Sequence, residues 1–325
     1  MLIYLLVILL LIIVYQKYFL IKEGIVFTSS YFIDKYKKDD IVIDTENKTL
    51  EKNDEIIHYK KLNKNSKHAN FHANKSLISE FLHKHDIPVS KSYTWNNQLS
   101  SEENLQHVHS LKKPYVVKPL DGEKGYGVTT DITTTEHLLK CVHELKGKVL
   151  IEEQAFGKEY RIMVFNDDII GITMKTPAFI IGDGEKTVQQ LIDSYNDTKL
   201  DPYKIHTIDY HYIQQQGYEM NDVLPINEKL IITHVANMSN GSTVNYIDID
   251  TVHPMNILLF KKINNVLELK LSGIDYICDD ISLPYYLTGI VIEVNDRPGF
   301  GIHYLVCPED KKKKLVDSVI DNVFE

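Results

Sequence analysis

The fold of this 325-residue chain depends most on the stretch Thr288-Gly-Ile-Val-Ile-Glu-Val-Asn-Asp-Arg-Pro-Gly299. Residues 290–294 form a short, apolar, mostly β-branched run, which predicts a buried strand. Because side chains alternate across a strand, Glu293 and Asn295 are expected to project from the same face. Burying an ionised carboxylate without a partner is costly. A cation or an arginine is therefore expected next to Glu293.

A second acid lies in a similar setting upstream. The stretch Ser272-Gly-Ile-Asp-Tyr-Ile277 places Asp275 among apolar neighbours. Two carboxylates and an amide oxygen on strands would make an oxygen-rich site, which suits Mg²⁺ bridging nucleotide phosphates. The alternative is a pair of acids at strand ends, capped by Arg297 or by backbone amides. These residues alone leave both interpretations open.

Composition narrows the class of protein. The chain is 43% hydrophobic and 25% charged, which allows one large domain or two to three subdomains with a sizeable core. A net charge of -9 argues against a nucleic-acid binder. The three cysteines are too widely spaced for a zinc pattern or a disulfide framework.

The N-terminus predicts a membrane anchor. Residues 2–15 are uninterrupted apolar, and the segment through Ile21 is long enough to span ~30 Å as a helix. No small-residue cleavage site follows it, and the nearest lysines all lie downstream, which favours a single uncleaved span with a cytoplasmic body. The alternative is a buried helix of the globular part. Residues 22–72 form a segment of uncertain structure to which no chemistry is assigned.

The block from Pro114 to Ile132 is typical of a nucleotide-binding lid. A strand ending in Lys118 is followed by a turn with three glycines, at positions 122, 125 and 127, and then by a second strand. Backbone N–H groups of such a turn can approach phosphates closely. A Walker or Rossmann loop would instead run directly into a helix. With Lys118 directed at the same anion, the block favours nucleotide binding.

The next strand, residues 148–153, ends in the adjacent acids Glu152 and Glu153. In the strand after it, Glu159 and Arg161 alternate onto one face, and a hairpin turn is expected at 166–168. Such a strand end can offer backbone groups to an adenine. The alternative for Glu159 and Arg161 is a cross-strand surface salt bridge, worth ~0–1 kcal/mol.

The order of these motifs resembles that of the ATP-grasp ligases, in particular the ATP-grasp domain of cyanophycin synthetases and of bifunctional glutathione synthetases. The likeness covers about residues 73–303. The motifs are, in order, Val-Val-Lys-Pro with its glycine turn, Ile-Glu-Glu with Gly-x-Glu-Tyr-Arg, Gly-Asp-Gly-x-x-Thr-Val, Ala-Asn-x-Ser, His-Pro-x-Asn, Gly-Ile-Asp, Asp-Ile-Ser and Glu-Val-Asn-x-x-Pro-Gly.

The resemblance implies an α+β ATP-grasp fold, in which two α+β subdomains grip ATP, preceded here by the transmembrane helix at 1–21. The ATP-grasp domain would span 73–308, with its lid at about 112–184 and a terminal helix at 309–325. Only about 20 residues follow His303, so the Mur-ligase-like domain of cyanophycin synthetases is not expected, and polymer synthesis is not transferred.

Site roles also follow from the resemblance. Binding of ATP is implied for Lys118, Gly122, Glu123, Lys124, Gly125, Tyr126, Gly127, Glu152, Glu153 and Glu159. Binding of Mg²⁺ or Mn²⁺ is implied for Asp275, Glu293 and Asn295. Catalytic or substrate contacts are implied for Arg161, Lys175, Asn237 and Ser239, with Arg161 and Lys175 facing the acyl phosphate.

Two departures from the family pattern concern the substrate end. Relatives usually continue Ala-Asn-x-Ser with Thr-Gly-Gly, whereas this chain has Asn240-Gly241-Ser242. Shortly before Ala-Asn-x-Ser, where the family pattern has an arginine, this chain has Thr233 with His234 beside it. Residues 201–220 are polar and aromatic, and they predict an insertion or flap near the substrate mouth.

Two functions remain open from the sequence. The first is a carboxylate-amine ligase that forms an amide or peptide-like bond through an acyl phosphate and releases ADP, acting on amino-acid or peptide-like substrates. The second is a membrane-tethered ATP-binding module without turnover, which the altered segment 240–242 suggests. Substrate-dependent release of ADP distinguishes the two.

Overall fold

The computed structural model describes residues 42–44, 49–52, 55–58, 63, 75–120, 127–145, 147–166, 168–199, 203–234, 236 and 240–323. The expected anchor at 1–21 lies outside these residues, as do Asn237, Ser239 and the turn at 121–126. Within the described ranges, no helix combines the length and the apolar character needed to cross a membrane. The predicted α+β architecture is confirmed.

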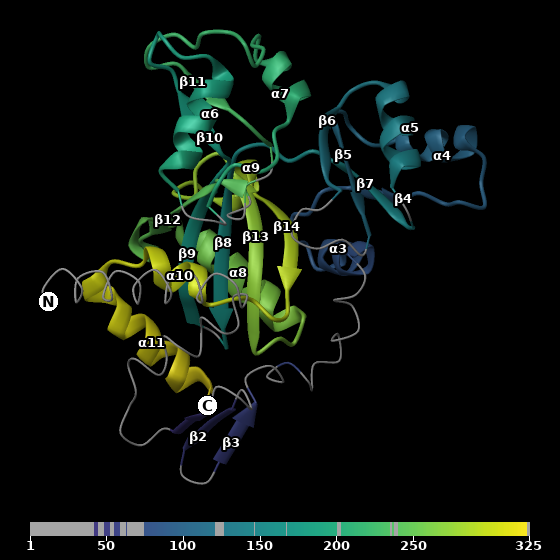
Figure 1. Ribbon diagram of the computed structural model, residues 1–325. Helices are drawn as coiled ribbons and strands as arrows, with labels where there is room; N and C mark the ends of the chain where they lie inside the picture. The colour runs from purple at the N-terminus through teal and green to yellow at the C-terminus, as the bar shows by residue number, and fades with distance from the viewer. Residues whose placement is uncertain are drawn as a thin grey trace, which may run out of the picture.

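A five-stranded antiparallel sheet, here called the main sheet, forms the centre of the molecule (Figure 1). Its strands in spatial order are β12 (Thr243–Ile247), β9 (Asp168–Thr176), β8 (Lys158–Phe165), β13 (Leu271–Cys278) and β14 (Ile290–Asn295). The hairpin expected at 166–168 joins β8 to β9, and Asn166 has a positive φ of 48° there. Asparagine tolerates this left-handed conformation better than most residues do.

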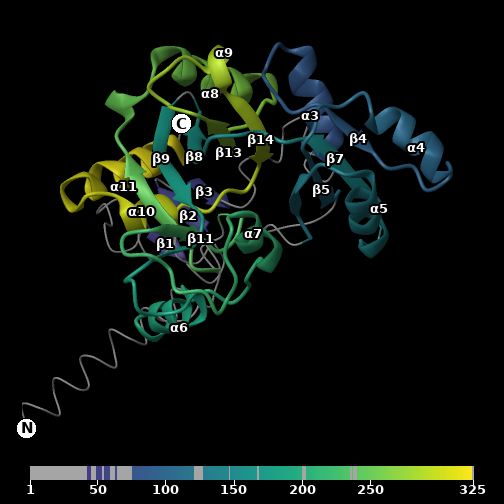
Figure 2. The ribbon, with the colours of Figure 1, turned by 90° about the horizontal axis from the view of Figure 1, so that it is seen from above.

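The two faces of the main sheet are covered by different helices (Figures 1 and 2). Alternation gives one apolar face, where Tyr160, Ile162 and Ile274 are buried against α3 (Lys75–Lys84) and α8 (Pro254–Val266). The short α9 (Tyr285–Thr288) packs beside α8. On the opposite face, one end is covered by α10 (Gly301–Val306) and α11 (Glu309–Val323). The rest of that face carries the charged side chains described below.

A four-stranded antiparallel sheet, here called the small sheet, lies to one side. Its strands in spatial order are β4 (Ser92–Thr94), β7 (Val149–Glu153), β5 (Tyr115–Pro119) and β6 (Thr129–Ile132). Helix α5 (Thr135–Glu144) completes its core. The two strands predicted on either side of the glycine turn are confirmed, because β5 pairs with β6 in antiparallel fashion. The lid limits of 112 and 184 remain a prediction, since β8 and β9 belong to the main sheet.

The polar composition of residues 96–111 predicts a loop beside the small sheet. That prediction is wrong, because the stretch contains α4 (Ser101–Val108). Ser100 and Glu103 form a capping box at its start, which satisfies otherwise free N–H groups. Asn104 is fully buried, and its side chain forms hydrogen bonds with the backbone of Asn96 in the preceding turn. A polar residue therefore occupies a buried position of this helix.

A third unit, here called the side lobe, comprises residues 178–234 and has its own apolar core. It contains β10 (Phe179–Ile181), α6 (Val188–Asp197), α7 (Tyr210–Gln215) and β11 (Lys229–Ile231). A separate three-stranded sheet consists of β1 (Val42–Asp44), β2 (Thr49–Lys52) and β3 (Glu55–His58). The 3-10 helix η4 (Ile249–Thr251) precedes α8.

All three cysteines are free and buried, and each lies in a different core. Cys141 lies in the core of the small sheet. Cys278 lies on the apolar face of the main sheet, and Cys307 lies under α11. Burial raises the pKa of all three thiols, that of Cys278 to about 11.

Candidate functional site

A buried ion-pair cluster centres on Asp275, on the polar face of the main sheet. Strand register places Asp275 opposite Arg161 of β8 on one side and opposite Glu293 of β14 on the other. The guanidinium of Arg161 donates from Nη1 to Oδ2 of Asp275 at 2.7 Å, and Nζ of Lys175 donates to Oδ1 at 3.0 Å. Both carboxylate oxygens therefore accept from a cation, as the burial argument requires.

Lys175 also links Asp275 to Glu159. Its Nζ lies 2.5 Å from Oε1 of Glu159, which is its register partner on β8. The alternative for Glu159 and Arg161 was a cross-strand salt bridge at the surface. Both residues do form cross-strand ion pairs, Glu159 with Lys175 and Arg161 with Asp275. The side chains of Arg161, Lys175 and Asp275 are only 12–17% exposed, so the cluster is not a surface feature.

Burial and pairing act against each other on these pKa values. Burial would raise the pKa of Asp275, but the charges of Arg161 and Lys175 outweigh it and hold that pKa below its usual range. For Glu159, burial prevails over Lys175, so its pKa is raised. Burial would lower the pKa of Lys175, but Asp275 and Glu159 outweigh it and raise that pKa. Lys175 and Asp275 therefore both remain charged.

The three proposed metal ligands lie on neighbouring strands. Asp275 pairs in register with Glu293, and Nδ2 of Asn295 donates to Oδ2 of Asp275 at 3.3 Å. The expected burial of Glu293 is wrong, because its side chain is 36% exposed; Nζ of Lys75 lies 3.6 Å from its Oε1. Arg297, one of the two caps considered, is largely exposed and lies beside Asp296.

Asp275, Glu293 and Asn295 carry donor types that Mg²⁺ takes, and in this structure both oxygens of Asp275 accept from Arg161 and Lys175. Mg²⁺ in phosphate-binding sites is commonly held by one or two carboxylates, while phosphates and water complete its coordination. Asp275, Glu293 and Asn295 supply two carboxylates and an amide at one place on the sheet. In the described part of the chain, no group of three or more His, Cys, Asp or Glu residues forms a self-sufficient metal site.

The predicted phosphate-binding lysine lies on the small sheet. Nζ of Lys118 is 2.5 Å from Oε2 of Glu152, and both side chains are about one-tenth exposed. The next acid, Glu153, accepts from the backbone N–H of Lys112 at 3.0 Å. Gly127, which closes the glycine turn, has a φ of +70°. The other predicted residues of the turn (Gly122, Glu123, Lys124, Gly125 and Tyr126) lie outside the described residues.

His303 lies next to the ion-pair cluster, although no sequence motif pointed to it. His303 of α10 is 2% exposed, and neither ring nitrogen has a hydrogen-bond partner among the described residues. Its ring covers Gly171 of β9, where an added Cβ would come within 2.8 Å of Nδ1. Burial, together with the charges of Arg161 and Lys175, lowers its pKa to about 3. A neutral imidazole therefore adjoins the cluster. Only its position after Pro298-Gly299 could have marked it.

The altered segment at the substrate end has a structural role. Oδ1 of Asn240 accepts from the backbone N–H groups of His206 and Thr207, both at 2.7 Å, and its Nδ2 donates to the carbonyl of Thr207 at 3.0 Å. Gly241 has a φ of +76°, and an added Cβ would come within 2.6 Å of Ile205. These residues fasten the side-lobe loop to the start of β12.

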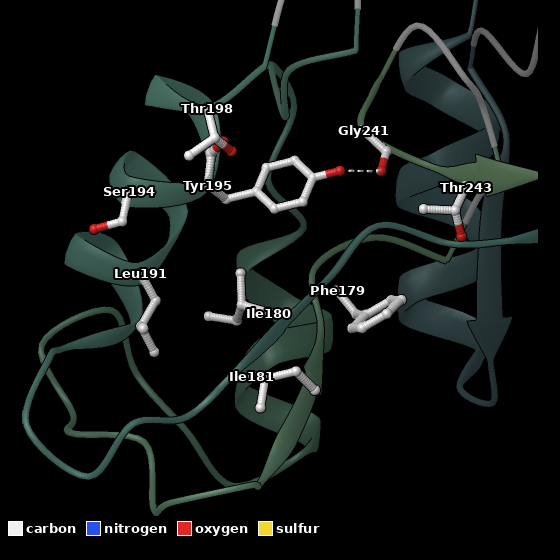
Figure 3. A pocket seen from close by; sticks show the side chains of 9 residues that line it. All are labelled: Phe179, Ile180, Ile181, Leu191, Ser194, Tyr195, Thr198, Gly241 and Thr243. Atoms are coloured by element: carbon white, nitrogen blue, oxygen red, sulfur yellow. Dashed lines mark hydrogen bonds between the residues drawn. The ribbon is translucent and has the colours of Figure 1, made fainter.

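A cavity of about 330 Å³ lies between α6, β10 and the start of β12 (Figure 3). The hydroxyl of Tyr195 donates to the carbonyl of Gly241 at 3.0 Å along its edge. None of the residues that line it is charged, so it does not suit a triphosphate. The lining residues are Phe179, Ile180, Ile181, Leu191, Ser194, Tyr195, Thr198, Gly241 and Thr243.

Comparison with known sequences finds relatives for most of the chain, although no family model matches it. It is 31% identical over 255 residues to a cyanophycin synthetase of Synechocystis sp., covering 73% of this chain and 28% of that protein. It is 24% identical over 296 residues to a bifunctional glutathione biosynthesis protein of Clostridium perfringens, covering 85% and 37%. The chain thus spans only about a quarter to a third of the length of these relatives.

Comparison with solved structures shows the fold. A bifunctional glutathione synthetase from Pasteurella multocida superposes with a TM-score of 0.61 at 20% identity, covering 91% of this chain and 44% of that one. A D-alanine–D-alanine ligase from Bacillus anthracis gives a TM-score of 0.50 at 16% identity, covering 79% and 69%.

Proposed function

Because the chain belongs to the ATP-grasp ligases, we propose that it is an ATP-dependent carboxylate-amine ligase. In this reaction a substrate carboxylate takes the terminal phosphoryl group of ATP, giving an acyl phosphate and ADP. A substrate amine then attacks the acyl carbon, phosphate leaves, and a proton is lost as the amide forms. The observation that carries the proposal is the buried cluster of Arg161, Lys175 and Asp275 beside two further oxygen ligands.

The nucleotide is proposed to lie between the small sheet and the polar face of the main sheet. Lys118 and the turn 122–127 would contact the phosphates, with Glu152 and Glu153 at the adenine and Glu159 at the ribose. In support, Lys118 is an ammonium group with little exposure, held in place by Glu152. Such a fixed charge favours an anion more than a mobile surface lysine does.

Asp275, Glu293 and Asn295 are proposed to hold Mg²⁺, or Mn²⁺ in its place. The ion supplies neutralisation of phosphate charge when bound. The protein's part is to keep Asp275 ionised, which Arg161 and Lys175 do. Because these two cations already lie beside the carboxylate, they are also placed to face the anionic carboxylate and acyl phosphate of the substrate. Asn237 and Ser239 are proposed to contact the substrate.

The alternative, an ATP-binding module without turnover, loses its main support. It was suggested by the altered segment 240–242, but Asn240 and Gly241 hold the side-lobe loop. Their departure from the family pattern therefore has a local structural cause. We retain the proposal that residues 1–21 anchor the protein in a membrane with its body on the cytoplasmic side, on the basis of apolar length and downstream lysines.

The test is substrate-dependent release of ADP. Purified protein would be screened with Mg²⁺, ATP, and panels of amino acids and small peptides, while calorimetry measures Mg-ATP binding separately. Ligase activity requires at least one carboxylate and amine pair that raises ADP release well above the rate with ATP alone. Binding of Mg-ATP with no such pair would favour the module without turnover.

A further inference from the structure

One contact joins the small sheet to the side lobe. Nδ1 of His234, three residues after β11, lies 3.1 Å from Oδ2 of Asp131 on β6. Its Nε2 lies 4.0 Å from Oδ2 of Asp209, and its ring packs on that of Tyr212 with centroids 3.4 Å apart. The side chain of His234 is only 17% exposed. The contact is therefore partly buried, unlike an ordinary surface pair.

On the small sheet, neighbouring side chains hold Asp131 in place for this contact. Asp131 has a φ of +56°, a conformation that costs energy for any residue with a side chain and persists only where its surroundings hold it. Gln154 does so: its Oε1 accepts from the backbone N–H of Asp131 at 2.7 Å, and its Nε2 donates to Oδ1 at 3.0 Å. This leaves Oδ2 directed at His234, with the hydroxyl of Thr130 also donating to it.

The side-lobe half is fixed as well. Asp209 caps α7 by accepting from the N–H of Tyr212 at 3.0 Å. The loop before α7 is held from two sides, by Asn196, which makes two bonds with the backbone of Ile205, and by Asn240. In both overall views α7 lies on the part of the side lobe that faces the small sheet (Figures 1 and 2).

A second ring contact strengthens the junction. His211 of α7 meets His137 of α5 edge to face, with centroids 5.7 Å apart. The charged or titratable groups around His234 are thus Asp131 from β6, and Asp209, His211 and Tyr212 from α7 and its cap. Two elements of the small sheet therefore contact two parts of the side lobe.

The location of the contact gives it a function. Asp131 is on the strand that pairs with β5, which carries Lys118. His234 lies three residues before Asn237, which is proposed to contact the substrate. We propose that the Asp131–His234 bridge fixes the position of the nucleotide-binding small sheet relative to the side lobe, so that Asp131, Gln154 and His234 are positioning residues for the ligase reaction. This rests on the proposed ligase function.

Positioning makes a distinctive kinetic prediction. A misplacement of about 1 Å between reacting groups can cost a large factor in rate without removing any contact to a substrate. Loss of the bridge is therefore expected to lower kcat while each substrate, bound alone, keeps its affinity. Because Asp131 and His234 act as one unit, removing both is expected to cost no more than removing one.

The experiment compares Asp131→Asn, His234→Gln and the double variant with the wild type. His143→Gln, on the exposed side of α5, is the matched control. Expected are a fall of about tenfold or more in kcat for ADP release in each single variant, an equal fall in the double variant, and Mg-ATP affinity within about twofold of the wild type. Fluorescence of Trp95, the single tryptophan, reports that the small-sheet core is intact.

Amide hydrogen exchange of residues 127–132 gives a readout that needs no turnover. Exchange is expected to be faster in both single variants than in the wild type and in His143→Gln. Unchanged exchange, or kcat equal to that of the control in an active enzyme, would overturn the bridge. A wild type without ADP release would refute the ligase function instead, and the exchange data would still decide whether the bridge exists.

Discussion

Arg161 and Asp275 lie directly opposite each other on β8 and β13, and Nη1 of the arginine donates to Oδ2 of the aspartate at 2.7 Å. Gly273, two residues before Asp275, makes room for this arrangement, because a Cβ there would come within 2.6 Å of Nη2 of Arg161. The guanidinium thus lies over a glycine and against a carboxylate. Its orientation is fixed before any anionic ligand arrives.

Gly273→Ala is expected to displace Arg161, since the same Cβ would also come within 2.6 Å of Pro298. Crowding of this kind costs ~1–3 kcal/mol of stability, and ADP release is expected to fall more than about tenfold. The control is Gly217→Ala, where φ is +86° and no atom lies within 4 Å. That variant is expected to be strained but active. Equal turnover in the two variants would show that the position of Arg161 does not matter.

Glu293→Gln is expected to abolish Mg-dependent ATP turnover while the fold survives. The change removes one anionic ligand in a nearly isosteric way. The side chain is 36% exposed and its ion pair with Lys75 is 3.6 Å long, so little stability is lost. Turnover is measured across a Mg²⁺ titration, and folding by the urea midpoint. Turnover like that of the wild type at every Mg²⁺ concentration would remove Glu293 from the metal site.

Loss of the Lys118 charge is expected to weaken nucleotide binding, because a fixed cation near the phosphates is deleted. Lys118→Ala alone would leave Glu152 buried without its partner, which costs ~3–5 kcal/mol. Lys118→Met combined with Glu152→Gln avoids that penalty, and Glu152→Gln alone is the control. Calorimetry that gives the double variant the same Mg-ATP affinity as the control would contradict the assignment.

Because of His303, the free energy of unfolding is expected to decrease as the pH is lowered. In the unfolded chain its imidazole takes up a proton as pH falls through about 6.5, whereas burial lowers the pKa of the folded residue to about 3. Between these values the unfolded state binds more protons, so the free energy of unfolding decreases as pH falls from about 7 towards 3. His303→Gln is expected to show a smaller decrease between pH 7 and 5 in urea titrations. Identical pH slopes would contradict a neutral buried imidazole.

Removal of residues 1–21 is expected to release a soluble protein that binds Mg-ATP with unchanged affinity, because all proposed nucleotide contacts lie from Lys118 onward. The intact chain is expected to need detergent for extraction. Recovery of intact protein from lysed cells without detergent, or a mature N-terminus beyond Ile21, would contradict the anchor.

The sequence predicted the grouping of the acids better than the identity of their partners. Alternation within one strand placed Glu293 and Asn295 together, and the cost of burying a charge required cations nearby. Which cations could not be predicted, because Arg161 and Lys175 are 114 and 100 residues away from Asp275 in the sequence. Their placement depends on the register of β8, β9 and β13, and an irregularity at Met163 and Val164 shifts that register.

Two features had no periodic signal in the sequence. The bridge between Asp131 and His234 depends on a left-handed backbone at Asp131 and on a tertiary bond from Gln154, neither of which has a periodic signature. His303 is buried by a short helix whose packing is decided by Gly171 on a distant strand. Helix α4 is a different case, since its capping pair, Ser100 and Glu103, was present in the sequence.

The three buried thiols allow the opening rates of three parts of this molecule to be measured separately. An alkylating reagent cannot reach Cys141, Cys278 or Cys307 until the core around each one opens, and each lies in a different core. Pulsed alkylation followed by peptide mass spectrometry would therefore give three independent opening rates from one sample of unmodified protein. If Mg-ATP slows the modification of Cys141 and Cys278 but not of Cys307, the ligand tightens the two sheets without stiffening the C-terminal helix.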